Sequence, residues 1–135
     1  MTETLPPPAG ELALQNLAMP RDANTNGDVF GGWVLSQMDL AGGVPAARRA
    51  KGRIATVAVE AMRFHAPISI GDLVSCYAEV TQVGTTSITV RIETWATRKS
   101  SGEKVRVTEG TYVFVAIDEQ GRPRPVPPSE LDEAQ

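Results

Sequence analysis

Two aspartates and five glycines share one stretch of the sequence, NGDVFGGWVLSQMDLAGG, from Asn26 to Gly43. Asp39 lies in a part of it whose apolar residues recur at helical spacing. A carboxylate in an apolar helix is expected to be buried, with a raised pKa, and it can then serve as a general base or a nucleophile. The alternative interpretation of Asp39 is a solvated residue on a helix face or a satisfied polar group of the core.

The glycine pairs that flank Asp39 predict two roles. Gly31 and Gly32 fall in the first helical turn, where backbone N–H groups lack an intrahelical acceptor and are able to polarise a carbonyl oxygen. Gly31 precedes Asp39 by eight residues, just over two helical turns. The helix tip would therefore polarise a carbonyl while a carboxylate of the same helix, or of a partner subunit, attacks it or activates water. Gly42 and Gly43 cost helix stability and make room for a close-packed backbone or a ligand.

The element that must position these groups is a helix from Phe30 to about Val44. Asp28 is well placed as its N-cap, which is the plainer interpretation of that residue. Pro45 is expected to end or kink the helix, because it lacks an N–H and crowds the carbonyl of Ala41.

One strand is expected before this helix in the sequence, at residues 12–18. Four are expected after it, at residues 53–66, 73–83, 88–98 and 105–118. Short turns favour antiparallel neighbours, so the fold class is α+β, with a sheet wrapped around one long helix. Segment 53–66 is apolar on both faces, and a second subunit is the simplest cover for it. The domain is predicted at 11–118, between a mobile N-terminal tail at 1–10 and a Pro-rich C-terminal tail at 119–135.

Composition excludes several classes of function. The net charge of −3 gives no electrostatic basis for nucleic-acid binding. One cysteine, Cys76, and one histidine, His65, are too few for a zinc site of Cys and His ligands, and no metal is expected. The N-terminus does not resemble a secretory signal, and no apolar run reaches the length of a membrane span, so we expect a cytoplasmic protein.

Four segments together identify a family. The segments NTNGDVFGGWVLSQMDLAGG, ATVAVEAMRFHAPISIGDLV, VGTTSITV and TEGTYVFVAID, in this order, resemble the YciA-like acyl-CoA thioesterases of the hot-dog fold. The resemblance runs from about Ala18 to Pro127. It implies homodimers that share a continuous sheet, often assembled as trimers of dimers (hexamers). It also implies hydrolysis of acyl-CoA to a free acid and CoA, without a cofactor or metal.

The resemblance also assigns catalytic roles. The helical carboxylate of the family falls on Asp39, and the polar residue before its glycine pair falls on Asp28. In the family these two positions face each other across the dimer. The donor role of the glycine N–H falls on Gly31 or Gly32, and Thr56 would orient the water or the carboxylate. Whether the carboxylate activates water or forms an anhydride is left open.

Contacts to CoA are expected from basic residues and one turn. The basic clusters are Arg48, Arg49, Lys51 and Arg53, and Arg98, Lys99, Lys104 and Arg106. Either cluster also fits a merely solubilising surface. The resemblance favours the turn Gly84, Thr85, Thr86 and Ser87 as the path of the pantetheine arm, although relatives often have a basic residue in place of Thr85. Asn26, Arg63, His65, Arg98 and Lys99 complete the predicted CoA- and substrate-binding residues.

Two other functions remain open from the sequence. One is a non-catalytic, regulatory acyl-CoA-binding protein. The other is a hot-dog dehydratase, which is disfavoured because those enzymes usually rely on a histidine near the helix. His65 is interpreted as a structural or substrate-lining residue, and Cys76 as a small core residue.

Overall fold

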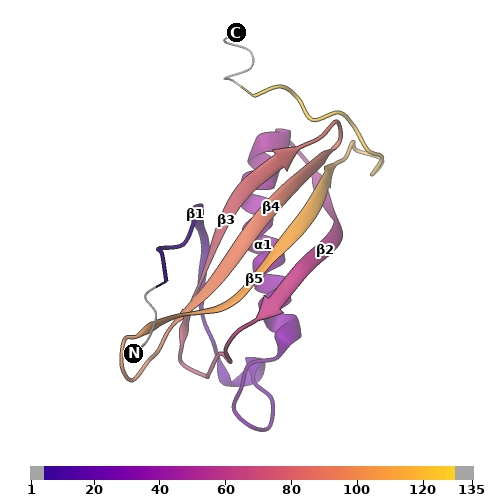
Figure 1. Cartoon of the computed structure of the whole chain (residues 1–135). Coiled ribbons are helices and arrows are strands. Elements are labelled where there is room, and N and C mark those ends of the chain that lie inside the picture. The colour runs from indigo at the N-terminus through magenta and orange to yellow at the C-terminus, as the bar shows by residue number, and fades with distance from the viewer. Residues whose placement is uncertain (1–4, 130–135) are drawn as a thin grey trace.

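The computed structural model describes residues 5–129 (Figure 1). One long helix lies against a sheet of five strands. The elements in chain order are β1 (Glu11–Leu17), a 3-10 turn (Pro20–Asp22), α1 (Gly31–Ala50), β2 (Ile54–Phe64), β3 (Leu73–Val83), β4 (Ser87–Thr97) and β5 (Lys104–Ala116).

The sheet is antiparallel throughout, with the order β1-β3-β4-β5-β2. Short turns join β3 to β4 and β4 to β5, as predicted. The strand after the helix, β2, pairs with β5 and forms one edge, whereas β1 forms the other edge (Figure 1). The α+β class and the single helix packed on a sheet are confirmed, and the strand bounds agree with the predicted ones to within about two residues.

The helix differs from the prediction at both ends. It continues past the buried Pro45 to Ala50, so the expectation that Pro45 ends it is wrong. The added turns bury Ala46 and Ala50 completely, and this packing outweighs the missing hydrogen bond. At the other end the N-cap residue is Phe30, which makes no side-chain cap, so the prediction of Asp28 as N-cap is also wrong.

Asp28 belongs instead to the loop before the helix. Its N–H donates to Asn24 Oδ1 at 3.2 Å, and its carbonyl accepts from the Asn24 N–H at 2.7 Å. A bridge to Ser69 ties this loop to the turn that precedes β3.

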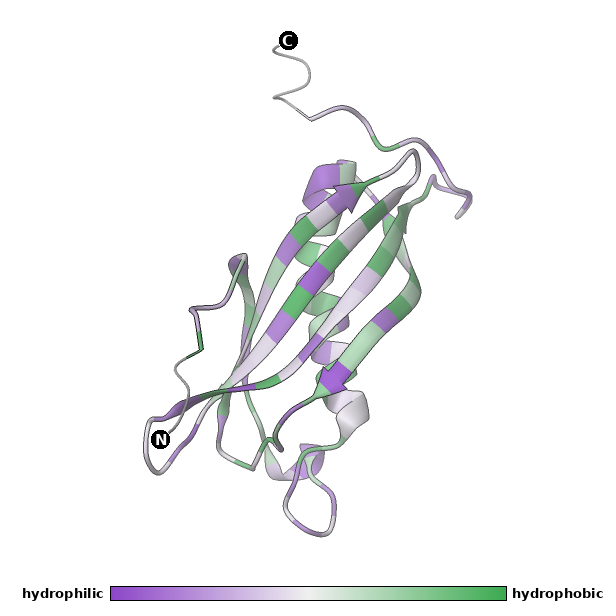
Figure 2. Cartoon of the chain, viewed as in Figure 1, coloured by the Kyte–Doolittle hydropathy of each residue, from purple (hydrophilic) through white to green (hydrophobic). Residues whose placement is uncertain are grey.

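The core lies between α1 and the inner face of the sheet. Residues on β4 alternate, with Ile88, Val90 and Ile92 fully buried toward the helix, and Figure 2 shows the corresponding alternation of hydropathy along β3 and β4. At the closest approach, a Cβ on Gly42 would lie 2.7 Å from Ile92 Cδ1 and 3.1 Å from the Phe114 ring. Gly42 therefore makes room for close helix–sheet packing, which is one of its two predicted roles.

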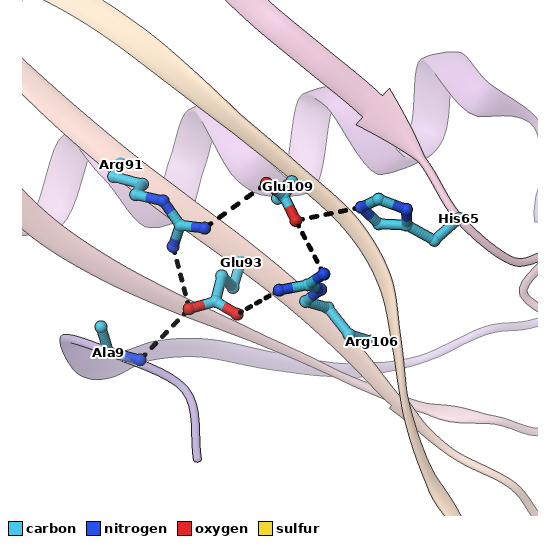
Figure 3. A network of polar contacts seen from close by, with 6 residues as sticks. All are labelled: Ala9, His65, Arg91, Glu93, Arg106 and Glu109. Atoms are coloured by element: carbon cyan, nitrogen blue, oxygen red, sulfur yellow. Dashed lines mark hydrogen bonds and ion pairs between the residues drawn. The ribbon is translucent and has the colours of Figure 1, made fainter. Parts of the chain in front are cut away.

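The outer face of the sheet carries a network of charges (Figure 3). Arg91 lies 2.9 Å from Glu93 and 3.5 Å from Glu109, and Arg106 lies 3.7 Å and 3.1 Å from the same carboxylates. His65 Nε2 lies 3.0 Å from Glu109. Partial burial acts to raise the pKa of Glu109, but the hydrogen bond with His65 and the charges of the two arginines outweigh it and lower that pKa.

Parts of both predicted tails contact the domain. The Ala9 N–H donates to Glu93 at 3.2 Å, and the Val126 N–H donates to the Thr85 carbonyl at 2.8 Å. Residues 1–4 and 130–135 lie outside the described residues, so the domain boundaries stay predictions. Within residues 5–129, no helix has the length and hydropathy that crossing a membrane requires.

The close approach at Gly42 predicts opposite effects of alanine at two neighbouring positions. Gly42→Ala should lower the free energy of unfolding by about 1 kcal/mol, because overpacking costs more than the gain in helix propensity. Gly43→Ala is the matched control, since a Cβ there meets only Ile54 Cδ1 at 3.7 Å. It should leave stability unchanged or raise it in chemical denaturation. Equal effects of the two substitutions would contradict the packing role of Gly42.

The charge network predicts a stability difference that depends on pH. Since the folded-state pKa of Glu109 is lowered, its contribution is present above the unfolded-state pKa and is lost as pH falls through the folded-state pKa. Glu109→Gln should therefore lower Tm at pH 7, and the deficit should shrink as the pH falls below about 4. Glu103→Gln, at an exposed position in the β4–β5 turn, is the control. A deficit that is constant with pH would assign the effect to packing instead.

Candidate active site

A hydrogen bond joins the middle of the helix to the edge strand. Thr56 Oγ1 on β2 donates to Asp39 Oδ1 on α1 at 2.5 Å. Thr56 is paired with Phe114 of β5, whose ring is buried in the core, so the Thr56 side chain shares the sheet face that carries the helix. The structure therefore brings together two of the predicted catalytic residues.

Asp39 is only half-buried in the single chain, which differs from the expected burial. The next residue on the helix, Leu40, is 60% exposed, and Thr56 is exposed as well. The apolar residues of this segment therefore do not form one buried surface. Those on one side of the helix pack on the sheet, and those on another side are exposed beside β2.

Tyr112 lies close to this pair and was missed by sequence reasoning. Its hydroxyl donates to the Leu35 carbonyl at 2.6 Å, one turn before Asp39. Burial raises the pKa of the Tyr112 phenol, and the negative charge of Asp39 raises it further, so the phenol stays neutral and remains a donor. The only sequence signal was an inward position on the predicted strand at 105–118, which a core aromatic residue would share.

The first turn of the helix carries the predicted donor glycines, whose role toward a substrate stays a prediction. Gly31 and Gly32 are exposed, and the N–H groups of Trp33 and Val34 already bond to the Phe30 carbonyl at 3.1 and 3.3 Å. Within residues 5–129, no acceptor is recorded for the N–H of Gly31 or Gly32. Both N–H groups are therefore available to an oxygen of a ligand.

A pocket of about 350 Å³ opens at this end of the helix. Its lining combines the first helical turn with the end of β2 and with β5, through Val29, Gly31, Val34, Phe64, His65, Ala66, Pro67, Ile68 and Thr108. His65 lies at the pocket wall, with Nε2 held by Glu109 (Figure 3), and its role toward a substrate stays a prediction. Most of the wall is apolar.

Asn26 and Asp28 lie in the loop that leads into the helix. The Asn26 N–H donates to Asn24 Oδ1 at 2.8 Å, which shapes the turn. Within the described residues, no hydrogen bond or ion pair is recorded for the Asp28 carboxylate. Its predicted place opposite the Asp39 of a partner subunit stays a prediction.

The predicted CoA-binding residues fall at two opposite ends of the sheet. The turn Gly84–Ser87 lies at the C-terminal end of α1, where the Thr86 carbonyl accepts from the Ala116 N–H at 2.9 Å (Figure 1). The basic cluster that includes Arg48 and Lys51 is at this same end and lines a second pocket of about 560 Å³. The turn and this cluster therefore lie at the same end of the helix.

The other basic cluster lies at the N-terminal end of α1 and is partly neutralised. Arg98 Nη1 donates to Asp72 Oδ2 at 2.5 Å and to the Pro67 carbonyl at 2.9 Å, so it clamps the turn before β3. The aliphatic part of Lys99 packs against Gly71. Arg63 is exposed on β2, opposite Glu109 in the register. The roles of Arg63, Arg98 and Lys99 toward CoA stay predictions.

Cys76 is a core residue, as the sequence suggested. Burial raises the pKa of its thiol to about 11, against the opposing effect of a 3.4 Å hydrogen bond with Thr94. The thiol is therefore protonated and unreactive at neutral pH. Among residues 5–129, no group of three or more His, Cys, Asp or Glu side chains is arranged to hold a metal ion.

Comparison with known proteins agrees with this architecture. Residues 26–102 match the thioesterase superfamily. The chain is 49% identical over 123 residues to the acyl-CoA thioester hydrolase YciA of Salmonella typhimurium, an alignment that covers 89% of this chain and 92% of that protein. The YciA of Escherichia coli K12 is 46% identical over 130 residues, covering 94% and 98% of the two chains.

Solved structures point to the same group. A hexameric thioesterase from Yersinia pestis superimposes with a TM-score of 0.86 at 48% identity, over 90% of this chain and 99% of that one. The alignments run through nearly the whole length of each relative. The chain therefore belongs to the YciA acyl-CoA thioester hydrolase family of the thioesterase superfamily, and its fold is the hot-dog fold.

Proposed function

We propose that this protein hydrolyses acyl-CoA thioesters to a free carboxylic acid and CoA. The observation that carries the proposal is the 2.5 Å hydrogen bond that orients the Asp39 carboxylate. The donors at the helix N-terminus, for which no acceptor is recorded within the described part of the chain, support it, and so do the names of relatives that share almost half of the sequence. The reaction uses groups of the protein alone.

The chemistry follows from these two features. The N–H groups of Gly31 and Gly32 polarise the thioester carbonyl and stabilise the negative charge that develops on its oxygen. Asp39 takes a proton from a water molecule whose oxygen attacks the carbonyl carbon. The C–S bond then breaks, and the CoA thiolate leaves and takes up a proton. Direct attack by Asp39, through an anhydride that water later cleaves, uses the same positions.

One helix cannot supply both parts of a single site. Gly31 and Asp39 are eight residues apart, about 12 Å of helix rise, whereas both groups must lie within about 3–3.5 Å of the reacting atoms. We infer that each site combines the helix tip and Asp28 of one chain with Asp39 and Thr56 of its partner.

The open side of the protomer supports such a pairing. Strand β2 is a sheet edge, and large apolar side chains are exposed along it and on the adjacent helix. They are Leu40, Val44, Val57, Val59 and Phe64, each at least 43% exposed. Pairing two β2 edges would form a continuous sheet, cover this apolar surface and complete the burial of Asp39. The hexameric relative supports a further assembly of three such dimers.

The dehydratase alternative has one observation in its favour. His65 lies in the pocket beside Gly31, although it is contributed by the end of β2 and not by the helix. Its Nε2 is already held by Glu109, at 3.0 Å. A dehydratase would convert a 3-hydroxyacyl-CoA into an enoyl-CoA without releasing a thiol, and a non-catalytic binding protein would leave both substrates unchanged.

Substitutions at the carboxylate should separate these functions. Asp39→Ala should lower kcat for acyl-CoA hydrolysis by roughly 10²–10⁴-fold, because the base or nucleophile is lost. Thr56→Val should cost about 10-fold through loss of the orienting hydrogen bond. Thiol release measured with a thiol reagent over a panel of acyl-CoA thioesters, beside the near-isosteric Asp39→Asn, tests both. Full turnover in Asp39→Ala, or no thiol release by the wild type, would refute the proposal.

Mixing two inactive variants tests the shared site. Asp28→Ala and Asp39→Ala homodimers should each be inactive, whereas a heterodimer regains one intact site. Unfolding and refolding an equimolar mixture should restore up to about a quarter of wild-type activity, since half of the dimers are mixed and each has one working site. A mixture that stays inactive would place both aspartates in the same chain's site. An active Asp28→Ala enzyme would remove Asp28 from the site altogether.

A further inference from the structure

Thr108 is a buried polar residue in the helix-tip pocket that the proposed reaction does not use. The residue is 1% exposed, and its hydroxyl oxygen is buried and has no hydrogen-bond partner among the described residues. It lines the same pocket as Gly31. Buried hydroxyl groups in proteins nearly always have a partner, so this exception calls for an explanation.

The strand pairing provides a direct comparison. Thr108 on β5 is opposite Thr94 on β4, and both side chains are buried. The Thr94 hydroxyl contacts Cys76 Sγ at 3.4 Å, which satisfies it within the core. Thr108 lies one strand closer to β2, opposite Phe64, and is part of the pocket lining, and within residues 5–129 no such neighbour is recorded for its hydroxyl. Both residues are threonines, but only Thr108 is part of the lining of this pocket.

The surroundings of Thr108 indicate what its partner must be. Among the described residues that line the pocket, His65 has the only other polar side chain, and its Nε2 is held by Glu109. The rest of the lining is formed by valine, phenylalanine, alanine, proline, isoleucine and glycine. A purely hydrocarbon acyl chain in this pocket would leave the Thr108 hydroxyl unsatisfied. An acyl group that carries an oxygen would satisfy it.

We propose that the Thr108 hydroxyl binds an oxygen on C3 of the acyl group and makes the enzyme favour 3-oxoacyl and 3-hydroxyacyl thioesters over plain acyl thioesters. This inference rests on the proposed function. With the thioester carbonyl at the Gly31 and Gly32 N–H groups, C2 and C3 are the first acyl atoms to enter the pocket. A hydroxyl both donates and accepts, so it serves a 3-oxo and a 3-hydroxy group alike.

Three four-carbon substrates test the contact, namely butyryl-CoA, 3-oxobutyryl-CoA and 3-hydroxybutyryl-CoA. In the wild type, kcat/KM should be higher for the two oxygenated substrates than for butyryl-CoA. The near-isosteric Thr108→Val should lower the ratio of oxygenated to plain substrate by about 10-fold, because one hydrogen bond is lost. Thr108→Ser, which keeps the hydroxyl, should retain the ratio. Comparing the 3-oxo and 3-hydroxy substrates shows which of the two groups is preferred.

Thr94→Val is the matched control, since it removes a buried threonine hydroxyl at the paired position outside the pocket. It should leave the substrate ratio at the wild-type value. An unchanged ratio in Thr108→Val, or an equal fall in kcat/KM for all three substrates, would overturn the proposal and assign Thr108 a structural role. An equal change of the ratio in Thr94→Val would overturn it as well.

Binding measurements separate this inference from the proposed hydrolysis. Calorimetric Kd values for the three thioesters on Asp39→Asn protein, with and without Thr108→Val, should show the same change in selectivity. If no thioester is hydrolysed by the wild type but Kd shows this selectivity, the proposed hydrolysis fails and the Thr108 contact stands. If hydrolysis is found without selectivity in either measurement, the Thr108 contact fails alone.

Discussion

The structure depends on the contact between one helix and the inner face of a five-stranded sheet. Gly42 allows α1 to lie directly on Ile92 and Phe114, which brings the helix axis close to β4 and β5. This distance sets where the flanks of the helix fall, so that Asp39 reaches Thr56 on the edge strand and Leu35 reaches the Tyr112 hydroxyl. A wider spacing would break both hydrogen bonds, because each is short and spans two elements.

The same contact explains why the site is open on one side. A helix of 20 residues covers part of the sheet and leaves a flank beside β2, with Leu40 60% exposed. In the proposed dimer this flank becomes the interface, and the half-buried Asp39 becomes buried only when the partner is present. The same surface would then form the dimer interface and complete the active site, in a chain of 135 residues with one core.

Much of the fold was predictable, and the errors have local causes. Alternation along residues 88–98 and 105–118 placed β4 and β5 well, because one face of each strand is buried and the other is polar. Proline at position 45 was misleading, since propensity rules omit the packing of Ala46 and Ala50 that holds the helix together beyond it. Aspartate is a residue type favoured at N-cap positions, but Asp28 is held in a loop by Asn24 and Ser69, and sequence spacing does not show these contacts.

The sequence by itself determined the class of fold, the family, and the residue types that a thioester hydrolase of this kind needs, because these follow from local pattern and from the four quoted segments. Only the tertiary structure decided which of these residues meet. It joined Asp39 to Thr56, set Arg98 against Asp72, and placed the turn Gly84–Ser87 and Gly31 at opposite ends of the helix. It also left the Thr108 hydroxyl without a hydrogen-bond partner among residues 5–129. Such contacts depend on strand order and on the helix–sheet distance, which join residues far apart in the chain and have no signature in local spacing.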